Sequence, residues 1–113
     1  MGLDSFWKTD QPVKFDPPLN LVGGAFSAFG EGSFRGKAYN SLIQRLTGVS
    51  LYQHAIDNVT IRKMAAELRD TPYLWAILKR DGTDEDISAG EYADLQRMFA
   101  AYAEAGAVLN GWW

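Results

Sequence analysis

The sequence predicts an α+β fold that is mostly α, with about four helices packed together and a short N-terminal hairpin or extended arm. Apolar residues recur at helical spacing after position 37, whereas the first 36 residues hold three of the four prolines and over half of the glycines. A chain of 113 residues, 47% of them hydrophobic, has the size and composition of one globular domain. We therefore expect a single domain over 1–113, with Gly- and Pro-rich loops and short strands in 1–36 and a helical body in 37–113.

The N-terminal third shows no sustained helical period. The segments 19–22 and 25–29 are largely apolar and flank Gly23 and Gly24, which can adopt the positive φ angles of a tight turn. This pattern predicts a hairpin over 19–29. It leaves open whether the N-terminal third pairs as a sheet or wraps the helices as an extended arm.

The next segments predict two amphipathic helices. The first starts at position 37 and has apolar side chains at i, i+3, i+4 and i+7: Tyr39, Leu42, Ile43 and Leu46. Gly48 stands where a left-handed C-terminal cap belongs. The second helix has Asp57 or Asn58 as its N-cap and ends near Asp70. Its apolar positions repeat the same spacing: Ile61, Met64, Ala65 and Leu68.

Two further helices complete the predicted helical body. A Thr-Pro pair starts the third, and the segment 73–79 that follows is apolar nearly all round, which is typical of a buried helix. Ser88 and Glu91 have the spacing of a capping box at the start of the fourth helix, and Gly106 marks its end. The tail 107–113 is expected to form a strand or a turn packed on the body.

The stretch GEGSFRGKAY, residues 30–39, has the spacing of glycines that suggests a phosphate-binding loop. A Walker-type loop needs glycine at position 31 and Ser or Thr at position 38, but these are Glu31 and Ala38. The kinase and dinucleotide loops need a third glycine at position 35, where Arg35 stands. We therefore expect no bound nucleotide and no other cofactor.

The same stretch supplies the first set of candidate binding residues: Gly32, Ser33, Phe34, Arg35 and Lys37. Backbone N–H groups beside a helix N-terminus, together with two cationic side chains, favour an anion or a partner's carboxylate. The alternative is structural. In that interpretation the glycines only shape a tight loop, while three phenylalanines pack in the core: Phe26, Phe29 and Phe34.

Catalytic and metal sites find little support in the sequence. His54 is the single histidine and there is no cysteine, so a two-histidine or thiolate metal site is excluded. Ser50 and Asp57 lie near His54 in the sequence, but no nucleophile elbow or oxyanion motif accompanies them. We expect a protein that is not an enzyme and holds no metal.

The second set of candidate binding residues is acidic: Asp84, Glu85 and Asp86. The segment 81–96 contains six acidic residues and no basic one, and its spacing does not match a calcium loop. We interpret it as a solvated anionic surface. The formal net charge of -3 disfavours duplex nucleic acid as a partner, because a duplex binder neutralises phosphates with basic side chains.

The sequence also bears on location and on surface contacts. No apolar run has the length of a membrane span, and the first residues lack the pattern of a signal peptide, so we expect no membrane partner and a cytoplasmic location. Aromatic residues make up 13% of the chain, and Trp112 and Trp113 end it. Such a pair either packs on the body or anchors a partner.

Three functions stay open at this point. The leading hypothesis is a non-catalytic module that binds another protein, as an inhibitor or adaptor of a basic partner, through the glycine-rich segment, the acidic stretch or both. The alternative is a small-molecule or anion-binding protein, or a weak enzyme, with Arg35, Lys37 and His54 around a pocket. A third hypothesis is a structural subunit of a homo-oligomeric assembly.

Overall fold

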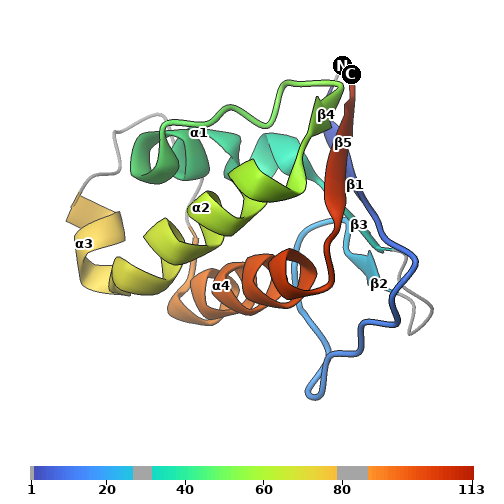
Figure 1. Ribbon diagram of the computed structural model, residues 1–113. Coiled ribbons are helices and arrows are strands. Elements are labelled where there is room, and N and C mark those ends of the chain that lie inside the picture. The colour runs from blue at the N-terminus through green and yellow to red at the C-terminus, as the bar shows by residue number, and fades with distance from the viewer. Residues whose placement is uncertain (1, 27–31, 79–86) are drawn as a thin grey trace.

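The computed structural model describes residues 2–26, 32–78 and 87–113. Over these residues it has an antiparallel five-stranded sheet and four helices (Figure 1). In chain order the elements are β1 (Asp4–Lys8), β2 (Ala25–Phe26), β3 (Gly32–Phe34), α1 (Gly36–Thr47), β4 (Ala55–Ile56), α2 (Asn58–Asp70), α3 (Tyr73–Leu78), α4 (Ala89–Glu104) and β5 (Val108–Trp112). The prediction of a mostly α fold, with only a hairpin or arm beside the helices, is therefore wrong, because a whole layer of the fold is a sheet.

The strands lie in the order β2-β3-β1-β5-β4, and each neighbouring pair is antiparallel. The N-terminal strand β1 is central and pairs with β5 over its whole length, from Asp4 opposite Trp112 to Lys8 opposite Val108. This pairing brings the two ends of the chain together, as Figure 1 shows. The central pairing of the sheet therefore joins strands from the two ends of the chain.

The predicted hairpin over 19–29 is also wrong in its pairing. Residues 19–22 form no strand, and β2 pairs with β3 instead. The turn itself is present, since Gly23 has a φ of 67° and the next N–H donates a hydrogen bond back across it. Residues 27–29, which belong to the predicted second arm, lie outside the described residues.

Three helices begin and end close to where the sequence predicts. The chain leaves α1 through Gly48, whose φ of 76° is the expected left-handed cap. Asp57 caps α2, because its side chain accepts a hydrogen bond from the N–H of Thr60 at 2.9 Å. At the start of α4, Ser88 and Glu91 form the predicted capping box, each side chain accepting from the other residue's backbone N–H.

The expectation that the third helix is a buried one is wrong. The side chains of Leu74 and Trp75 in α3 are 72% and 60% exposed. The helix is anchored by the buried side chain of Ala76 and by the hydroxyl of Tyr73, which donates to the carbonyl of Ile87 at 2.7 Å. A helix of six residues buries one side against α4, and its other side stays in solvent.

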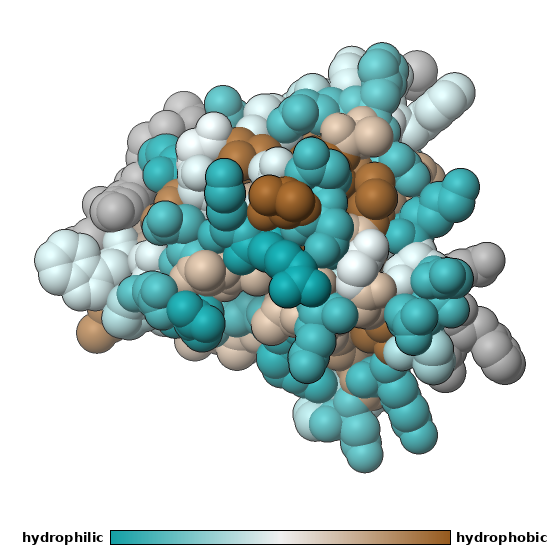
Figure 2. Space-filling view, in the orientation of Figure 1, coloured by the Kyte–Doolittle hydropathy of each residue, from teal (hydrophilic) through white to brown (hydrophobic). Residues whose placement is uncertain are grey.

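The helices cover one face of the sheet, and no helix of the described residues covers the other face (Figure 1). β1 shows the alternation clearly, because Ser5 and Trp7 are buried toward the helices while Phe6 and Lys8 are exposed on the opposite side. The hydrophobic core lies between the two layers. Figure 2, in the same orientation, shows that the surface on the helical side is mostly hydrophilic, with scattered hydrophobic residues.

The long connection from β1 to β2 is held against α4 by polar contacts. Near its start, the hydroxyl of Thr9 donates to the carbonyl of Ala105 at 2.9 Å. Near its end, the N–H of Asn20 donates to the carboxylate of Asp94 at 2.8 Å. These contacts tie the connection to the helical layer.

Candidate binding surface

The side chains that point away from the helices form a mixed aromatic and polar surface, which we call the open face. The strand register places five of them in one row across the sheet: Ala25, Ser33, Phe6, Asn110 and Ala55. Lys8 lies on one side of this row and Trp112 on the other. The side chains of Phe6 and Trp112 are 44% and 73% exposed. The open face is therefore defined by Asp4, Phe6, Lys8, Ala25, Ser33, Ala55, Val108, Asn110 and Trp112.

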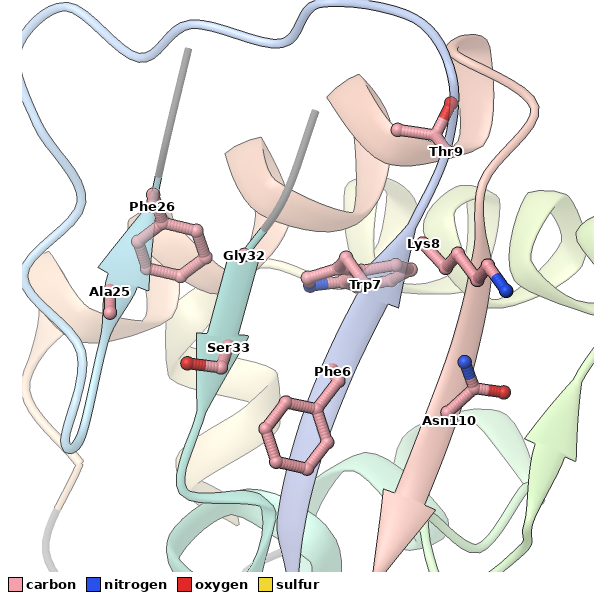
Figure 3. A pocket seen from close by; sticks show the side chains of 9 residues that line it. All are labelled: Phe6, Trp7, Lys8, Thr9, Ala25, Phe26, Gly32, Ser33 and Asn110. Carbon is pink, nitrogen blue, oxygen red and sulfur yellow. The ribbon is translucent and has the colours of Figure 1, made fainter. Parts of the chain in front are cut away.

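A groove of about 730 Å³ is hollowed into one end of the open face, between β2, β3, β1 and β5 (Figure 3). Three aromatic residues border it: Phe6, whose ring lies on the open face, and Trp7 and Phe26, whose side chains the register places on the helix-covered side. Four polar side chains also line it: Lys8, Thr9, Ser33 and Asn110. Lys8 and Asn110 are diagonal neighbours on paired strands, because Lys8 lies opposite Val108 and Asn110 lies opposite Phe6. The groove thus combines apolar walls with a polar flank.

Trp7 borders the groove, but its ring is turned toward the helices and packs in the core. Its ring stacks on Tyr102, with centroids 4.5 Å apart and an angle of 7° between the planes. The ring of Phe99 meets it edge-on, with a centroid distance of 5.1 Å. The indole nitrogen Nε1 is buried and has no hydrogen-bond acceptor among the described residues. In Figure 3 this nitrogen lies at the end of the ring that faces Gly32.

Tyr102 places a second buried polar atom against Gly32, on the helix-covered side of the sheet. Its hydroxyl has no hydrogen-bond partner among the described residues. It approaches Gly32 so closely that a Cβ atom at this position would collide with it. Burial raises the pKa of Tyr102 to about 12, so the hydroxyl stays protonated at neutral pH and keeps a hydrogen to donate. The Trp7 nitrogen and the Tyr102 hydroxyl are thus two buried polar atoms without a partner among the described residues.

The structure separates the five predicted residues of the glycine-rich segment. Gly32 and Ser33 line the groove. Phe34 points the other way and is buried in the core. Arg35 and Lys37 are exposed at the start of α1 and do not line the groove. Only the first two of the predicted binding residues belong to the groove.

The start of α1 offers fewer free donors than the sequence suggests. The N–H of Arg35 donates to the carbonyl of Val22 at 2.8 Å, and the N–H of Lys37 donates to the carbonyl of Leu3 at 3.2 Å. The guanidinium of Arg35 also pairs with Asp4 at 3.0 Å. The anion site at this helix start stays a prediction, with two of its backbone donors already used within the fold.

The glycines of this segment have a packing role in the structure. A Cβ atom at Gly36 would collide with the hydroxyl of Ser5 and lie 2.9 Å from the side chain of Leu3. The absence of a side chain lets the first turn of α1 approach β1, just as Gly32 makes room for Tyr102. Close packing therefore accounts for these two glycines without a phosphate ligand.

His54 does not take part in a catalytic arrangement among the described residues. Its ring stacks on Trp113, with centroids 5.0 Å apart and an angle of 13° between the planes. The hydroxyl of Ser50 accepts from the N–H of Tyr52 at 3.1 Å, while Asp57 caps α2. His54 also lies outside the lining of the groove. Of the terminal tryptophans, the last packs on this ring, whereas Trp112 extends into solvent.

Three other predictions concern the acidic residues, a metal site and a membrane span. The acidic candidates Asp84, Glu85 and Asp86 lie outside the described residues. Among the residues that the structure describes, no group of three or more acidic or histidine side chains is arranged to hold a metal ion. In the same part of the chain, no helix combines the length and the apolar character needed to cross a membrane.

No family model, curated protein or solved structure matches this chain. The site therefore has to be argued from its own residues. Sequence reasoning missed the residues that define it best: Phe6, Lys8, Asn110 and Trp112. A signal existed in 4–8, where every second residue is buried, but the inward position 5 is a serine and the outward position 6 a phenylalanine. Because a buried position is polar and an exposed position is aromatic, the sequence does not show the apolar–polar alternation that identifies a half-buried strand.

Proposed function

We propose that this protein is a non-catalytic binding module that recognises another protein through the open face. The observation that carries the proposal is the exposure of Phe6, a residue that is 44% exposed on a sheet face that no described helix covers. Trp112 adds a second exposed ring on the same face. Large aromatic side chains are common anchors of protein interfaces, because they bury much apolar area with few rotatable bonds.

The neighbours of these rings indicate the chemistry of the partner. Lys8 makes no ion pair among the described residues, so its ammonium group is available to a carboxylate of the partner. Ser33 and Asn110 offer hydrogen bonds between the aromatic side chains. We infer a partner that presents apolar side chains to Phe6 and Trp112 and a carboxylate to Lys8. The basic partner of the inhibitor hypothesis depends on the acidic residues outside the described part of the chain, and it stays a prediction.

The non-catalytic part of the proposal has separate support. Within the described residues, His54 is engaged by ring stacking, and neither Ser50 nor Asp57 hydrogen-bonds to it. A nucleophile and its general base normally lie within hydrogen-bonding reach of each other. Among the polar side chains of the open face, Asp4 is paired with Arg35, and the others are those of Lys8, Ser33 and Asn110, with no hydrogen bond among these described residues joining a nucleophile to a base.

Affinity capture with mass spectrometry tests the proposal. We expect the wild-type protein to retain one partner in fixed stoichiometry. Phe6→Ser and Trp112→Ser should each reduce the retained amount by about tenfold or more, because central aromatic anchors contribute most of the binding energy. Val59→Ser is the matched control, since Val59 is also exposed but lies on α2, in the helical layer. This variant should retain the partner like the wild type.

Two results would contradict the proposal. Equal retention by wild type, Phe6→Ser and Trp112→Ser would show that the open face does not bind. Loss of the partner with Trp75→Ser alone would move the binding surface to α3.

Sedimentation at several protein concentrations tests the third hypothesis, a subunit of a homo-oligomeric assembly. A mass that doubles with concentration and reverts in Phe6→Ser would make the partner a second copy of this chain.

A further inference from the structure

We propose that the open face binds a second copy of this chain, and that the two copies pack sheet on sheet about a twofold axis. The inference rests on the proposed function, because it names the partner of the same surface. It is carried by the side chains of β1 and β5, whose charges and apolar groups are complementary to themselves under one rotation.

The charges of β1 stand on either side of Phe6. Asp4, Phe6 and Lys8 are alternate residues of this strand, so their side chains point from the same face. Lys8 has no ion pair among the described residues. Asp4 pairs with Arg35 at 3.0 Å through Oδ1, and a carboxylate with two oxygens can accept from a second cation. An acid and a base are therefore placed symmetrically about one exposed aromatic ring.

The paired strand β5 has the same symmetry with apolar groups. Asn110 lies opposite Phe6 in the row across the sheet, and Trp112 and Val108 lie two positions to either side of Asn110. Trp112 is largely exposed, and Val108 is partly exposed. Each of the two central strands thus carries two unlike side chains that flank the same row.

A half-turn about this row brings the unlike side chains together. When a second sheet faces the first and the axis runs along the row between them, each strand crosses its own copy in the opposite direction. Asp4 of each copy then faces Lys8 of the other, which pairs both charges. Trp112 faces Val108 in the same way, so an aliphatic side chain covers an exposed indole. In the row itself, the ring of Phe6 meets its own copy.

The other simple way of stacking the two sheets is less favourable. With the axis parallel to the strands, between β1 and β5, each residue of β1 would face its β5 neighbour from the other copy. Asp4 would then face Trp112, and Lys8 would face Val108. Both charges would lose water without gaining an opposite charge, which is costly. The charges therefore favour the half-turn about the row.

The size of the face predicts a weak dimer. Five strands and a central strand of five residues give a patch of about 24 Å by 17 Å, from the usual strand spacing and rise. Two copies would bury on the order of 1,000 Å² in total, which is near the lower limit of specific interfaces. We therefore expect a Kd of about 100 µM, so that the dimer forms in concentrated solution.

Sedimentation equilibrium with two charge-reversal variants tests the proposal. The Asp4→Lys chain has cations at both paired positions, and the Lys8→Asp chain has anions at both, so each variant faces like charges in its own dimer. We expect each reversal to raise the Kd at least about tenfold, because symmetry makes the change count twice. An equimolar mixture of the two variants should dimerise nearly as well as the wild type, since every cation then faces an anion.

The mixture also serves as the control for folding. Asp4→Lys removes the pair with Arg35, but a chain that had lost its fold could not form the mixed dimer. Lys63→Asp is the matched control for the change of net charge, because it reverses an exposed lysine of α2, in the helical layer. This variant should dimerise like the wild type.

Three results would overturn the proposal: a wild-type protein that stays monomeric at about 1 mM, well above the expected Kd, a mixture of folded variants that forms no dimer, or a dimer that Phe6→Ser leaves unchanged. Affinity capture separates these failures from failure of the proposed function. Capture that still depends on Phe6 and Trp112 would keep the open face as a binding surface for a different protein. Capture that ignores both residues would contradict the proposed function itself.

Discussion

Trp7 of β1 stacks on Tyr102 of α4, with ring centroids 4.5 Å apart and an angle of only 7° between the planes. The contact joins the central strand of the sheet to the last helix, and Phe99 and Phe34 pack against other sides of the same indole. Trp7 therefore lies where the two layers of the fold meet. Its immediate neighbour Phe6 faces the opposite side of the sheet, in the open face.

Replacing Trp7 tests this role in stability. We expect Trp7→Ala to lower the free energy of unfolding by about 3–5 kcal/mol, because it leaves a large cavity between the layers. Trp112→Ala is the comparison, since this ring is 73% exposed and should change stability by less than about 0.5 kcal/mol. Urea denaturation followed by circular dichroism measures both. Equal losses in the two variants would contradict the described packing of β1 on α4.

Two buried tyrosines should respond differently to loss of the hydroxyl. The hydroxyl of Tyr92 donates to the carbonyl of Thr71 at 2.7 Å, so Tyr92→Phe should cost about 1 kcal/mol. The hydroxyl of Tyr102 has no partner among the described residues, so Tyr102→Phe should be neutral or slightly stabilising. The midpoints of denaturant unfolding of the two variants, each compared with the wild type, measure these differences. A larger loss in Tyr102→Phe would reveal a hydrogen bond to this hydroxyl.

Alkaline pH should weaken the fold through the same two residues. Burial raises the pKa of Tyr92 and Tyr102 to about 12, whereas an unfolded tyrosine has a pKa of about 10. Above pH 10, to about pH 12, the unfolded chain binds fewer protons than the folded one, so the free energy of unfolding falls as the pH rises. Ultraviolet titration should therefore show a late phase near pH 12. A titration complete by about pH 11 would contradict both shifts.

Glycine substitutions test whether the glycine-rich segment serves packing. Gly36→Ala places a methyl group against Ser5 and Leu3, and we expect a loss of about 1–3 kcal/mol. Gly90→Ala is the matched control in α4, because the nearest atom to its Cβ would be the hydroxyl of Ser88 at 3.9 Å. This control should gain about 0.5–1 kcal/mol from the higher helix propensity of alanine. Thermal unfolding checks both, and a stabilising Gly36→Ala would refute the packing account.

The helices could be predicted from the sequence because their signals are local. Apolar residues at helical spacing, the Asp57 cap and the capping box of Ser88 with Glu91 all lie within a few positions of each other. The sheet could not be predicted in the same way. β1 and β5 pair across almost the whole chain, and the edge strands β2 and β4 have only two residues each. Such pairings depend on tertiary packing rather than on local propensity.

The candidate surface was predictable only in part, for the same reason. The glycine-rich segment directed attention to Gly32 and Ser33, which do line the groove. Phe34, two positions from Gly32, turned out to be a core residue. Phe6 and Asn110 come from opposite ends of the chain and become neighbours only through the pairing of β1 with β5. No motif links them, because their proximity is a property of the assembled sheet.

Hydroxyl-radical footprinting of the protein with its captured partner tests the central claim, that the open face is the binding surface. Side chains of Phe6 and Trp112 are exposed in the isolated protein, as are those of Leu74 and Trp75 on α3. We predict that the partner strongly reduces oxidation of Phe6 and Trp112 and leaves oxidation of Leu74 and Trp75 unchanged. Protection of the two α3 residues, with Phe6 and Trp112 as reactive as before, would contradict the claim.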